Sequence, residues 1–375
     1  TDLVGSAEHR GGFGRSGVVE NQGIRSVSGH YWVYETEGPI VAAPVAYGQW
    51  VLVGSTSGTF YALNMTDKSV LWTMDTGGVS ATPAVALAQL GEGSNEATVV
   101  VADDDGLVQA RAIARDALTT VQWRESLGAG ILSSPVIADG RVLVATADDP
   151  GSVHALDLFN GDPIWVYPTD GDPSMGRVSA DLAYADGVLY VGGEDGLLYL
   201  IDAASGELIC SKDFGAPIVA NPVVVDGVVY VPTEGNQIHV RPAGACEGTV
   251  ENRLPFYLTE VPVSVAPAIV GDAMYLPSGV FLYKIDLTES TPSEDRHLWP
   301  ASTVTAARTI SSSPVVAGDT VIIGSGDGLV RAVDATSGET LWEWQTGQSV
   351  RGSPAVIEGA VFIASADGKV YAVGE

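Results

Sequence analysis

The amino-acid sequence predicts an all-β fold, an eight-bladed β-propeller built from four-stranded antiparallel blades. A turn glycine between two strand-like segments recurs eight times, at intervals of 39 to 49 residues. A proline recurs ahead of seven of these glycines. Short strands that repeat every ~40–50 residues are typical of propeller blades. The glycines are Gly58, Gly106, Gly151, Gly196, Gly235, Gly279, Gly328 and Gly368.

The prolines indicate the first, innermost strand of each blade. Proline has no N–H to donate and is confined to strand edges, and the innermost strand of a blade is an edge that faces the central channel. An apolar residue stands four positions before each proline. The fourth repeat departs from this pattern: we assign Asp181 to its proline position and Arg177 to its apolar position. The prolines are Pro44, Pro83, Pro135, Pro222, Pro267, Pro314 and Pro354.

Turn chemistry defines the second and third strands. The second strand follows an Asp-Gly or Gly-Asp pair, as at Asp139-Gly140. Such pairs accept the positive φ that two-residue hairpin loops need. The third strand ends in an aspartate, whose carboxylate is expected to accept backbone N–H groups of the next turn. These aspartates are Asp157, Asp202, Asp286 and Asp334.

The fourth strand carries a tryptophan in most repeats, a ring large enough to fill the space between neighbouring blades. The last repeat, Val350–Glu375, supplies only three strands, whereas Tyr31–Glu35 has a fourth-strand pattern and precedes the first repeat. This N-terminal strand is therefore predicted to complete the last blade and remove a free sheet edge. We divide the chain into an N-terminal extension, residues 1–29, and the propeller, residues 30–375. The tryptophans are Trp72, Trp123, Trp165, Trp299 and Trp342.

The turn-and-tryptophan pattern resembles a known family. Ala155–Trp165 and Ala332–Trp342 both read Ala-x-Asp-x-x-x-Gly followed by an apolar–Trp pair. This is similar to the pyrroloquinoline-quinone-like repeat with its tryptophan-docking motif, over nearly the whole chain. The family has a catalytic branch, the quinoprotein dehydrogenases, and a non-catalytic branch. The latter includes the BamB-type outer-membrane assembly lipoproteins and the extracellular sensor domains of some bacterial Ser/Thr kinases.

The non-catalytic branch fits the sequence better. The resemblance implies that quinoprotein dehydrogenases are longer chains that carry two adjacent cysteines. This chain has only Cys210 and Cys246, which are not adjacent. The resemblance therefore implies a non-enzymatic scaffold outside the cytoplasm (periplasmic, cell-surface or secreted) that binds protein partners through its loops and holds no pyrroloquinoline quinone. Two alternatives stay open. One is a small quinoprotein oxidoreductase that uses the quinone and calcium, and the other is the sensor domain of a membrane kinase.

Composition limits the partners. The formal net charge of −28 argues against nucleic acid, whose phosphates require basic patches. No segment reaches the roughly 18 apolar residues that a membrane span needs, so direct membrane insertion is not expected. We expect a monomeric ring whose acidic surface keeps it soluble.

Three arginines form a candidate anion site at one mouth of the channel. Arg177, Arg308 and Arg351 stand at the entrances of first strands in a chain that has few cations, and Asp181 lies nearby. An arginine fork matches a carboxylate, so the three could bind an anion together. The alternative is that each arginine pairs with a neighbouring carboxylate, for example Asp181.

Two further sites rest on clustered or paired side chains. Asp103, Asp104 and Asp105 could supply oxygen ligands to calcium. The alternative is ordinary turn chemistry, since an acidic turn recurs at this point of other repeats. Cys210 takes the tryptophan position of the fourth repeat, and Cys246 stands where the fourth strand of the fifth repeat should begin. They could form a disulfide in an oxidising compartment or remain two buried thiols.

Overall fold

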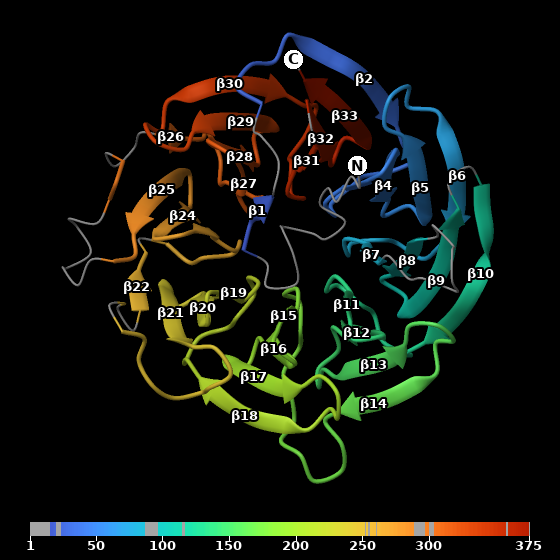
Figure 1. The fold of residues 1–375 in the computed structure, drawn as a ribbon, viewed down its shortest axis with the longest axis vertical. Helices are drawn as coiled ribbons and strands as arrows, with labels where there is room; N and C mark the ends of the chain where they lie inside the picture. Colours follow the sequence, from blue (N-terminus) through green and yellow to red (C-terminus); the bar gives the residue numbers. More distant parts are fainter. Residues whose placement is uncertain are drawn as a thin grey trace.

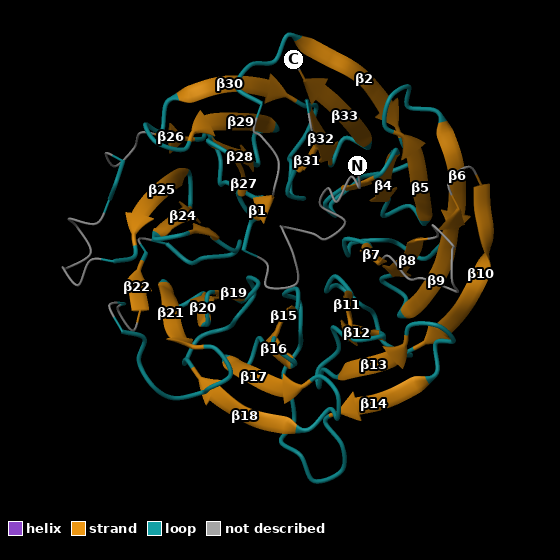
Figure 2. Cartoon of the chain, in the orientation of Figure 1, coloured by secondary structure: helices purple, strands orange, loops and turns teal. Residues whose placement is uncertain are grey.

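Eight sheets, seven of four strands and one of five, surround a central axis (Figure 1). This computed structural model describes residues 16–19, 24–86, 97–114, 117–251, 253, 256–259, 261–288, 297–299, 304–357 and 359–374. Figure 2 shows strands joined by loops, and the described residues contain no helix that is long and apolar enough to cross a membrane. The predicted eight-bladed propeller is confirmed.

Each blade begins at the axis and ends at the rim, with strands paired in chain order. The first four blades consist of β3 (Val45–Tyr47), β4 (Trp50–Gly54), β5 (Thr59–Asn64) and β6 (Val70–Asp75); β7 (Ala84–Ala86), β8 (Ala97–Ala102), β9 (Leu107–Ala114) and β10 (Ala117–Ser126); β11 (Val136–Ala138), β12 (Arg141–Ala145), β13 (Val153–Asp157) and β14 (Pro163–Tyr167); and β15 (Ala183–Ala185), β16 (Val188–Gly192), β17 (Leu197–Asp202) and β18 (Leu208–Asp213).

The other four blades have the same plan. They consist of β19 (Val223–Val225), β20 (Val228–Thr233), β21 (Gln237–Pro242) and β22 (Phe256–Leu258); β23 (Ala268–Val270), β24 (Ala273–Ser278), β25 (Phe281–Asp286) and β26 (Val304–Thr305); β27 (Val315–Ala317), β28 (Thr320–Gly324), β29 (Leu329–Asp334) and β30 (Thr340–Gln345); and β31 (Ala355–Ile357), β32 (Ala360–Ser365), β33 (Lys369–Gly374) and β2 (Gly29–Glu35).

The hydrophobic core is a ring of interfaces between blades. One cluster, for example, joins Leu143 and Val153 of blade 3 to Leu189 and Tyr199 of blade 4. The β-branched middle strands favour this arrangement because their two faces pack against different neighbouring blades. Adjacent blades therefore stabilise one another.

The ends of the chain close the ring as predicted. β2 pairs antiparallel with β33, and Gly29 lies opposite Gly374. The sheet order β2-β33-β32-β31 makes the N-terminal strand the outermost strand of blade 8. In Figure 1 the blue β2 accordingly lies beside the red β33.

The N-terminal extension also contributes a strand that the sequence did not indicate. β1 (Val18–Val19) pairs in parallel with β27, opposite Val316 and Ala317. Val19 and Ile24 are buried in the core cluster that joins blades 7 and 8. Residues 16–19 and 24–28, here called the strap, are thus integrated into the propeller. Residues 1–15 of the predicted extension lie outside the described residues.

The predicted register of blade 4 was wrong by one residue. β15 starts at Ala183, as β11 starts at Val136 directly after Pro135. Leu182 therefore takes the proline position, and Asp181 takes the position before it. The apolar position is held by Val178, which is fully buried, and not by Arg177. The missing proline had removed the landmark that fixes the register.

The turn predictions hold where the structure tests them. Asp139 and Gly140 have φ of 50° and 74°, the geometry expected of a tight Asp-Gly hairpin. Asp157 and Asp334 each accept two backbone N–H groups of the following turn. In blade 5, Asn236 rather than Gly235 adopts the positive φ of the turn.

Candidate functional site

A polar cavity of about 210 Å³ lies on the axis of the ring. Every blade contributes to its wall from the segment just before its innermost strand, which is why the cavity is axial. The lining is largely small hydroxyl, amide and alanine side chains, with one carboxylate, Asp181, and one guanidinium, Arg351, among the described residues.

A belt of hydrogen bonds holds this wall together. In several blades the residue directly before the proline position donates its backbone N–H to the side chain of the equivalent residue in the next blade. Thr82 donates to Ser134 at 3.2 Å, and Ser134 donates to Asp181 at 2.7 Å. Asp181 in turn donates its N–H to Asn221 at 2.9 Å. Further links join Ala43 to Thr82 and Ala266 to Ser313.

Asp181 is the residue of the belt with the most side-chain contacts. Its second carboxylate oxygen accepts the Asn221 side-chain amide at 2.9 Å, in addition to the Ser134 N–H. Asp181 and Asn221 thus tie blades 3, 4 and 5 together at the axis. Sequence reasoning missed the belt, although small polar residues recur directly before the prolines. That signal would have been sufficient to find it.

The structure separates the four residues of the predicted anion site. Arg351 and Asp181 both line the axial cavity, but Arg177 and Arg308 do not. The three arginines stand at different positions relative to the buried apolar residues Val178, Ile310 and Val350, so their side chains leave the backbone in different places. The structure thus brings two of the four to one cavity.

One of the three arginines pairs with a neighbouring carboxylate, which was the alternative to an anion site. Arg177 lies 3.7 Å from the carboxylate of Glu194, and both side chains are partly exposed. Such a pair contributes little to stability. Arg308 and Arg351 form no hydrogen bond or ion pair with the part of the chain that the structure describes. Asp181, suggested as a partner, accepts hydrogen bonds from Ser134 and Asn221 within the belt.

The acidic turn of blade 2 makes structural hydrogen bonds. Asp103 is buried and accepts N–H groups from Gly77, Asp105 and Leu107 at 2.8–3.1 Å. Asp104 accepts both the N–H and the hydroxyl of Ser80. Among the described residues, no three acidic, histidine or cysteine side chains are placed to hold a metal ion. A calcium ion at this turn stays a prediction.

The same carboxylate contact recurs in other blades. Asp195 and Asp367 each accept a glycine N–H from the linker that enters their own blade, at 2.8 Å. Tyr199 and Tyr371 donate their hydroxyls to these two carboxylates. Burial, followed by the neighbouring carboxylate, raises the pKa of Tyr371 to about 12. The acidic turns therefore anchor the linkers between blades.

At the rim, tryptophans of the fourth strands connect one blade to the next. Trp123 donates its indole N–H to the Leu158 carbonyl at 2.8 Å, and Trp165 donates to Ala203 at 3.2 Å. The ring of Trp123 packs against Gly161, where an added Cβ would lie 2.6 Å from the ring. Only glycine fits there, and its positive φ of 77° also favours glycine.

Another donor replaces tryptophan in blade 5, and a lysine joins the tryptophan in blade 6. Between blades 5 and 6, Arg253 donates to the Leu287 carbonyl at 3.1 Å. Between blades 6 and 7, Lys284 and Trp299 donate to the carbonyls of Ala335 and Thr336. A donor thus crosses several of the junctions, and tryptophan supplies it most often, although the buried indole N–H of Trp72 has no hydrogen-bond partner.

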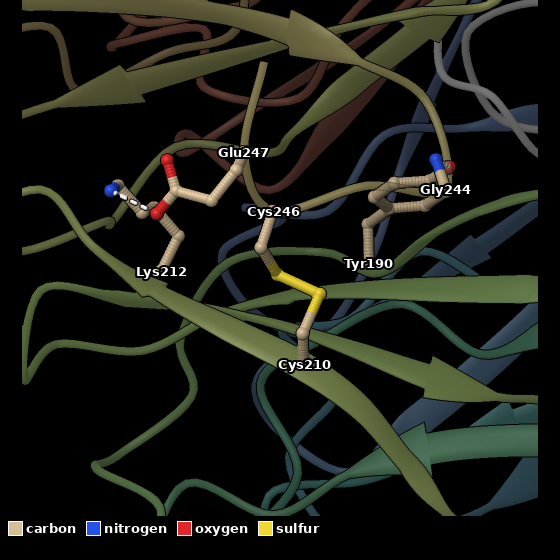
Figure 3. The surroundings of a disulfide bond; sticks show 6 residues. All are labelled: Tyr190, Cys210, Lys212, Gly244, Cys246 and Glu247. Atoms are coloured by element: carbon tan, nitrogen blue, oxygen red, sulfur yellow. Dashed lines mark hydrogen bonds and ion pairs between the residues drawn. A yellow bond between two sulfur atoms is a disulfide. The ribbon is translucent and has the colours of Figure 1, made fainter.

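A disulfide lies between blades 4 and 5. Cys210, on β18, is bonded to Cys246, with the two Cα atoms 6.2 Å apart (Figure 3). Cys210 lies opposite Leu200 in the sheet, as Trp165 lies opposite Ala155. The covalent bond thus stands in the place of the indole contact. Lys212–Glu247 and Gly244–Tyr190 contacts flank it, both at 2.7 Å.

The fold and these junctions define an eight-bladed propeller whose blades are linked at the axis by the belt and at the rim by cross-blade donors. Comparison with known proteins identifies the family of propellers to which the chain belongs. The family described as outer membrane protein assembly factor BamB matches residues 88–180 and 172–375, and the chain belongs to this pyrroloquinoline-quinone-like repeat family.

Individual relatives come from two groups. The BamB of Moranella endobia is 24% identical over 77% of this chain and 70% of its own length. The putative dehydrogenase XoxF of Paracoccus denitrificans is 34% identical, but over 32% of this chain and 22% of its own length. Several curated BamB proteins are matched over 61–70% of their length.

Solved structures from both groups share the fold. The crystal structure of BamB from Moraxella catarrhalis matches with a TM-score of 0.68 and 19% identity, covering 92% of this chain and 99% of that one. A quinohemoprotein alcohol dehydrogenase of Pseudomonas putida matches with a TM-score of 0.75 and 14% identity, over 100% of this chain and 80% of that one. These likenesses establish the architecture alone.

The axial cavity does not fit the quinone of the catalytic branch. Its described lining has no aromatic side chain on which a planar ring could stack. The cysteines lie 36 residues apart at the junction of blades 4 and 5, where they cannot form a vicinal pair over the axis. Asp181 is its only carboxylate among the described lining residues, whereas calcium takes several oxygen ligands.

Proposed function

We propose that the chain is a non-enzymatic, extracytoplasmic scaffold that binds protein partners through the loops of the ring. The observation that carries this proposal is the family match, which spans residues 88–375. The dehydrogenase XoxF, by contrast, aligns with only 32% of the chain. The lining of the axial cavity supports the same choice because it does not suit the quinone.

The disulfide supports a location outside the cytoplasm. Disulfides persist in oxidising compartments such as the periplasm and the cell exterior and are rare in the cytosol. Cys210 and Cys246 are the only cysteines of the chain, and they are joined. A monomeric ring is also part of the proposal, since closure by β2 leaves no blade incomplete.

One loop is the best candidate for a partner contact. The connection from β14 to β15 runs from residue 168 to residue 182, whereas the other connections between blades hold eight or nine residues. It projects from the ring beside β14 and β18 (Figure 1). Residues 169–174 are exposed and include Asp170 and Asp172.

This loop is ordered by its own contacts. Asp172 accepts the N–H and the hydroxyl of Thr169 at 2.9 and 2.7 Å. Met175, at the end of the exposed stretch, is buried and forms a bridge with Gly151. A loop whose shape is fixed before binding loses less conformational entropy when a partner binds. Its acidic side chains favour a partner with a basic surface.

Site-specific photo-crosslinking tests the proposal. A benzophenone amino acid replaces Asp170, or Glu339, an exposed turn residue of blade 7, as the matched control. Crosslinking is performed in the native host and analysed by mass spectrometry. We expect one reproducible protein adduct from position 170 and none from position 339. Equal labelling of many proteins from both positions would contradict a specific contact at this loop.

A further inference from the structure

We propose that the axial cavity is a binding site for a small carboxylate, with Arg351 as the residue that recognises it. This site does not depend on the protein-binding role proposed above. The sequence predicted an anion site made by three arginines, and the present proposal keeps only Arg351, which lines the axial cavity.

Arg351 provides the charge. Its side chain lines the cavity and is exposed, and it forms no hydrogen bond or ion pair with any residue the structure describes. The other arginines near blade entrances differ from it: Arg177 pairs with Glu194, and Arg308 lies outside the cavity. A guanidinium fork binds a carboxylate through two parallel hydrogen bonds, which gives both affinity and orientation.

Three serine hydroxyls of the cavity wall already donate hydrogen bonds within the protein. The Ser311 hydroxyl donates to the Val350 carbonyl at 2.7 Å, and the Ser353 hydroxyl donates to the Ser313 carbonyl at 3.0 Å. The Ser80 hydroxyl donates to Asp104. These three hydroxyls have given their protons to the protein, whereas those of Thr82, Ser134 and Ser313 accept backbone N–H groups and keep a proton that can assist Arg351. The oxygens of the same hydroxyls can still accept protons from hydroxyl or amide groups of a ligand.

Asp181 restricts the charge that the cavity accepts. Its carboxylate is held by Ser134 and Asn221 and faces the same cavity as Arg351. A second negative charge on a ligand would be repelled by Asp181, since like charges in a partly dry site disfavour one another. The pair therefore favours a monocarboxylate.

The size of the cavity limits the ligand further. Drug-sized ligands occupy pockets of about 300–1,000 Å³, and this cavity holds about 210 Å³. At about 30 Å³ per water molecule, that volume corresponds to roughly seven waters. A small hydroxy acid fits, and so does the last residue of a peptide with a free C-terminal carboxylate.

Calorimetric titration of the whole chain distinguishes these two sources. L-lactate is compared with lactamide, which has the same shape without the charge. The tripeptide Ala-Ala-Ala is compared with its C-terminal amide. We expect saturable binding of lactate, of the free-acid tripeptide or of both, and at least tenfold weaker binding of the uncharged partners. Binding of the acids and their amides with equal affinity, or of none of them, would overturn the proposal.

Variants then assign the binding to Arg351. Arg351→Gln is expected to weaken binding of the acid at least tenfold, while Arg308→Gln, the matched exposed arginine outside the cavity, stays within twofold of the unmodified protein. Thermal melting confirms that both variants fold. Binding by Arg351→Gln with unchanged affinity would refute the assignment, whatever the outcome of the crosslinking at the loop.

Discussion

The junction between blades 2 and 3 and the junction between blades 7 and 8 solve the same problem with different parts of the chain. At the first, Trp123 donates to the Leu158 carbonyl, in the turn after the third strand of the next blade. At the second junction the acceptor comes from a different segment. Trp342 donates instead to the Ile24 carbonyl of the strap, at 2.7 Å.

The difference shows that a segment outside the repeats can provide the acceptor for the indole. The strap also supplies Arg25, which pairs with Asp319 and Asp334 on blade 7. It further accepts the N–H groups of Ile269 and Val316 at 2.8 Å. The closing junction is therefore assembled from three parts of the chain, whereas the junction of blades 2 and 3 uses two successive repeats.

Removal of the two indoles is the largest perturbation of this comparison. Trp123 and Trp342 are similarly buried, at 6% and 7% exposure, so each change to alanine should lower the free energy of unfolding by about 3–5 kcal/mol. Only Trp342→Ala should release the strap. Hydrogen exchange at the Ile269 and Val316 amides is expected to accelerate in this variant alone. Acceleration in Trp123→Ala as well would contradict a specific role of Trp342 in holding the strap.

Removal of the disulfide compares a covalent junction with the hydrogen-bonded ones. Replacement of Cys210 and Cys246 by serine opens a cross-link with a sequence separation of 36. It should cost about 2–4 kcal/mol, measured by urea unfolding. Reduction of the unmodified protein serves as the control and should lower its stability by a similar amount, with no effect on the double variant. An unchanged unfolding midpoint would mean that packing alone holds blades 4 and 5.

The smallest effect concerns the charges of the strap. Hydrogen bonds from the Ser337 backbone, followed by that from Arg25, lower the pKa of Asp334 from 3.8 to about 2. Because this folded-state pKa lies below the unfolded value, the stabilisation is complete above pH 3.8 and is lost as the pH falls towards 2.

Arg25→Gln should therefore raise the pKa of Asp334 towards its ordinary value without removing the contribution of Ser337. Carbon NMR titration of the Asp334 carboxyl measures this directly. Arg177→Gln, which disrupts an exposed pair elsewhere, should leave the titration unchanged. The difference between Arg25→Gln and the unmodified protein should also shrink in high salt, which screens exposed charges. If Arg25→Gln left the pKa of Asp334 unchanged, the whole shift would come from the hydrogen bonds of the turn that contains Ser337.

The architecture could be predicted because short sequence patterns that determine turns and strands recur in most blades. Turn glycines, Asp-Gly pairs and third-strand aspartates each have a backbone requirement that one residue type satisfies. Closure by Tyr31–Glu35 followed from one incomplete repeat. The register of blade 4 was predicted wrongly because Leu182 replaces the proline. A leucine next to other apolar residues does not show where the strand begins.

The site was harder to predict because it depends on contacts between repeats. Asp181 bonds to Ser134 and Asn221, which are 47 and 40 residues away. The three hold the same position in successive repeats, but the missing proline of blade 4 concealed this for Asp181. The three arginines had been grouped by their distance from a proline, but one-residue differences in register direct neighbouring side chains to different faces. β1 was missed since two residues are too few to show an alternating pattern.

Closure by β2 has a consequence for the order of folding. The partner of β2 is β33, so Trp32 and Ala372 become neighbours only after the 339 residues between them have been made. During synthesis or export the leading segment must wait, with an open sheet edge, until the trailing segment emerges. Contacts this distant form slowly, and exposed edges invite pairing with other molecules. A chaperone that shields the first strands of the nascent protein would protect it at its most vulnerable stage.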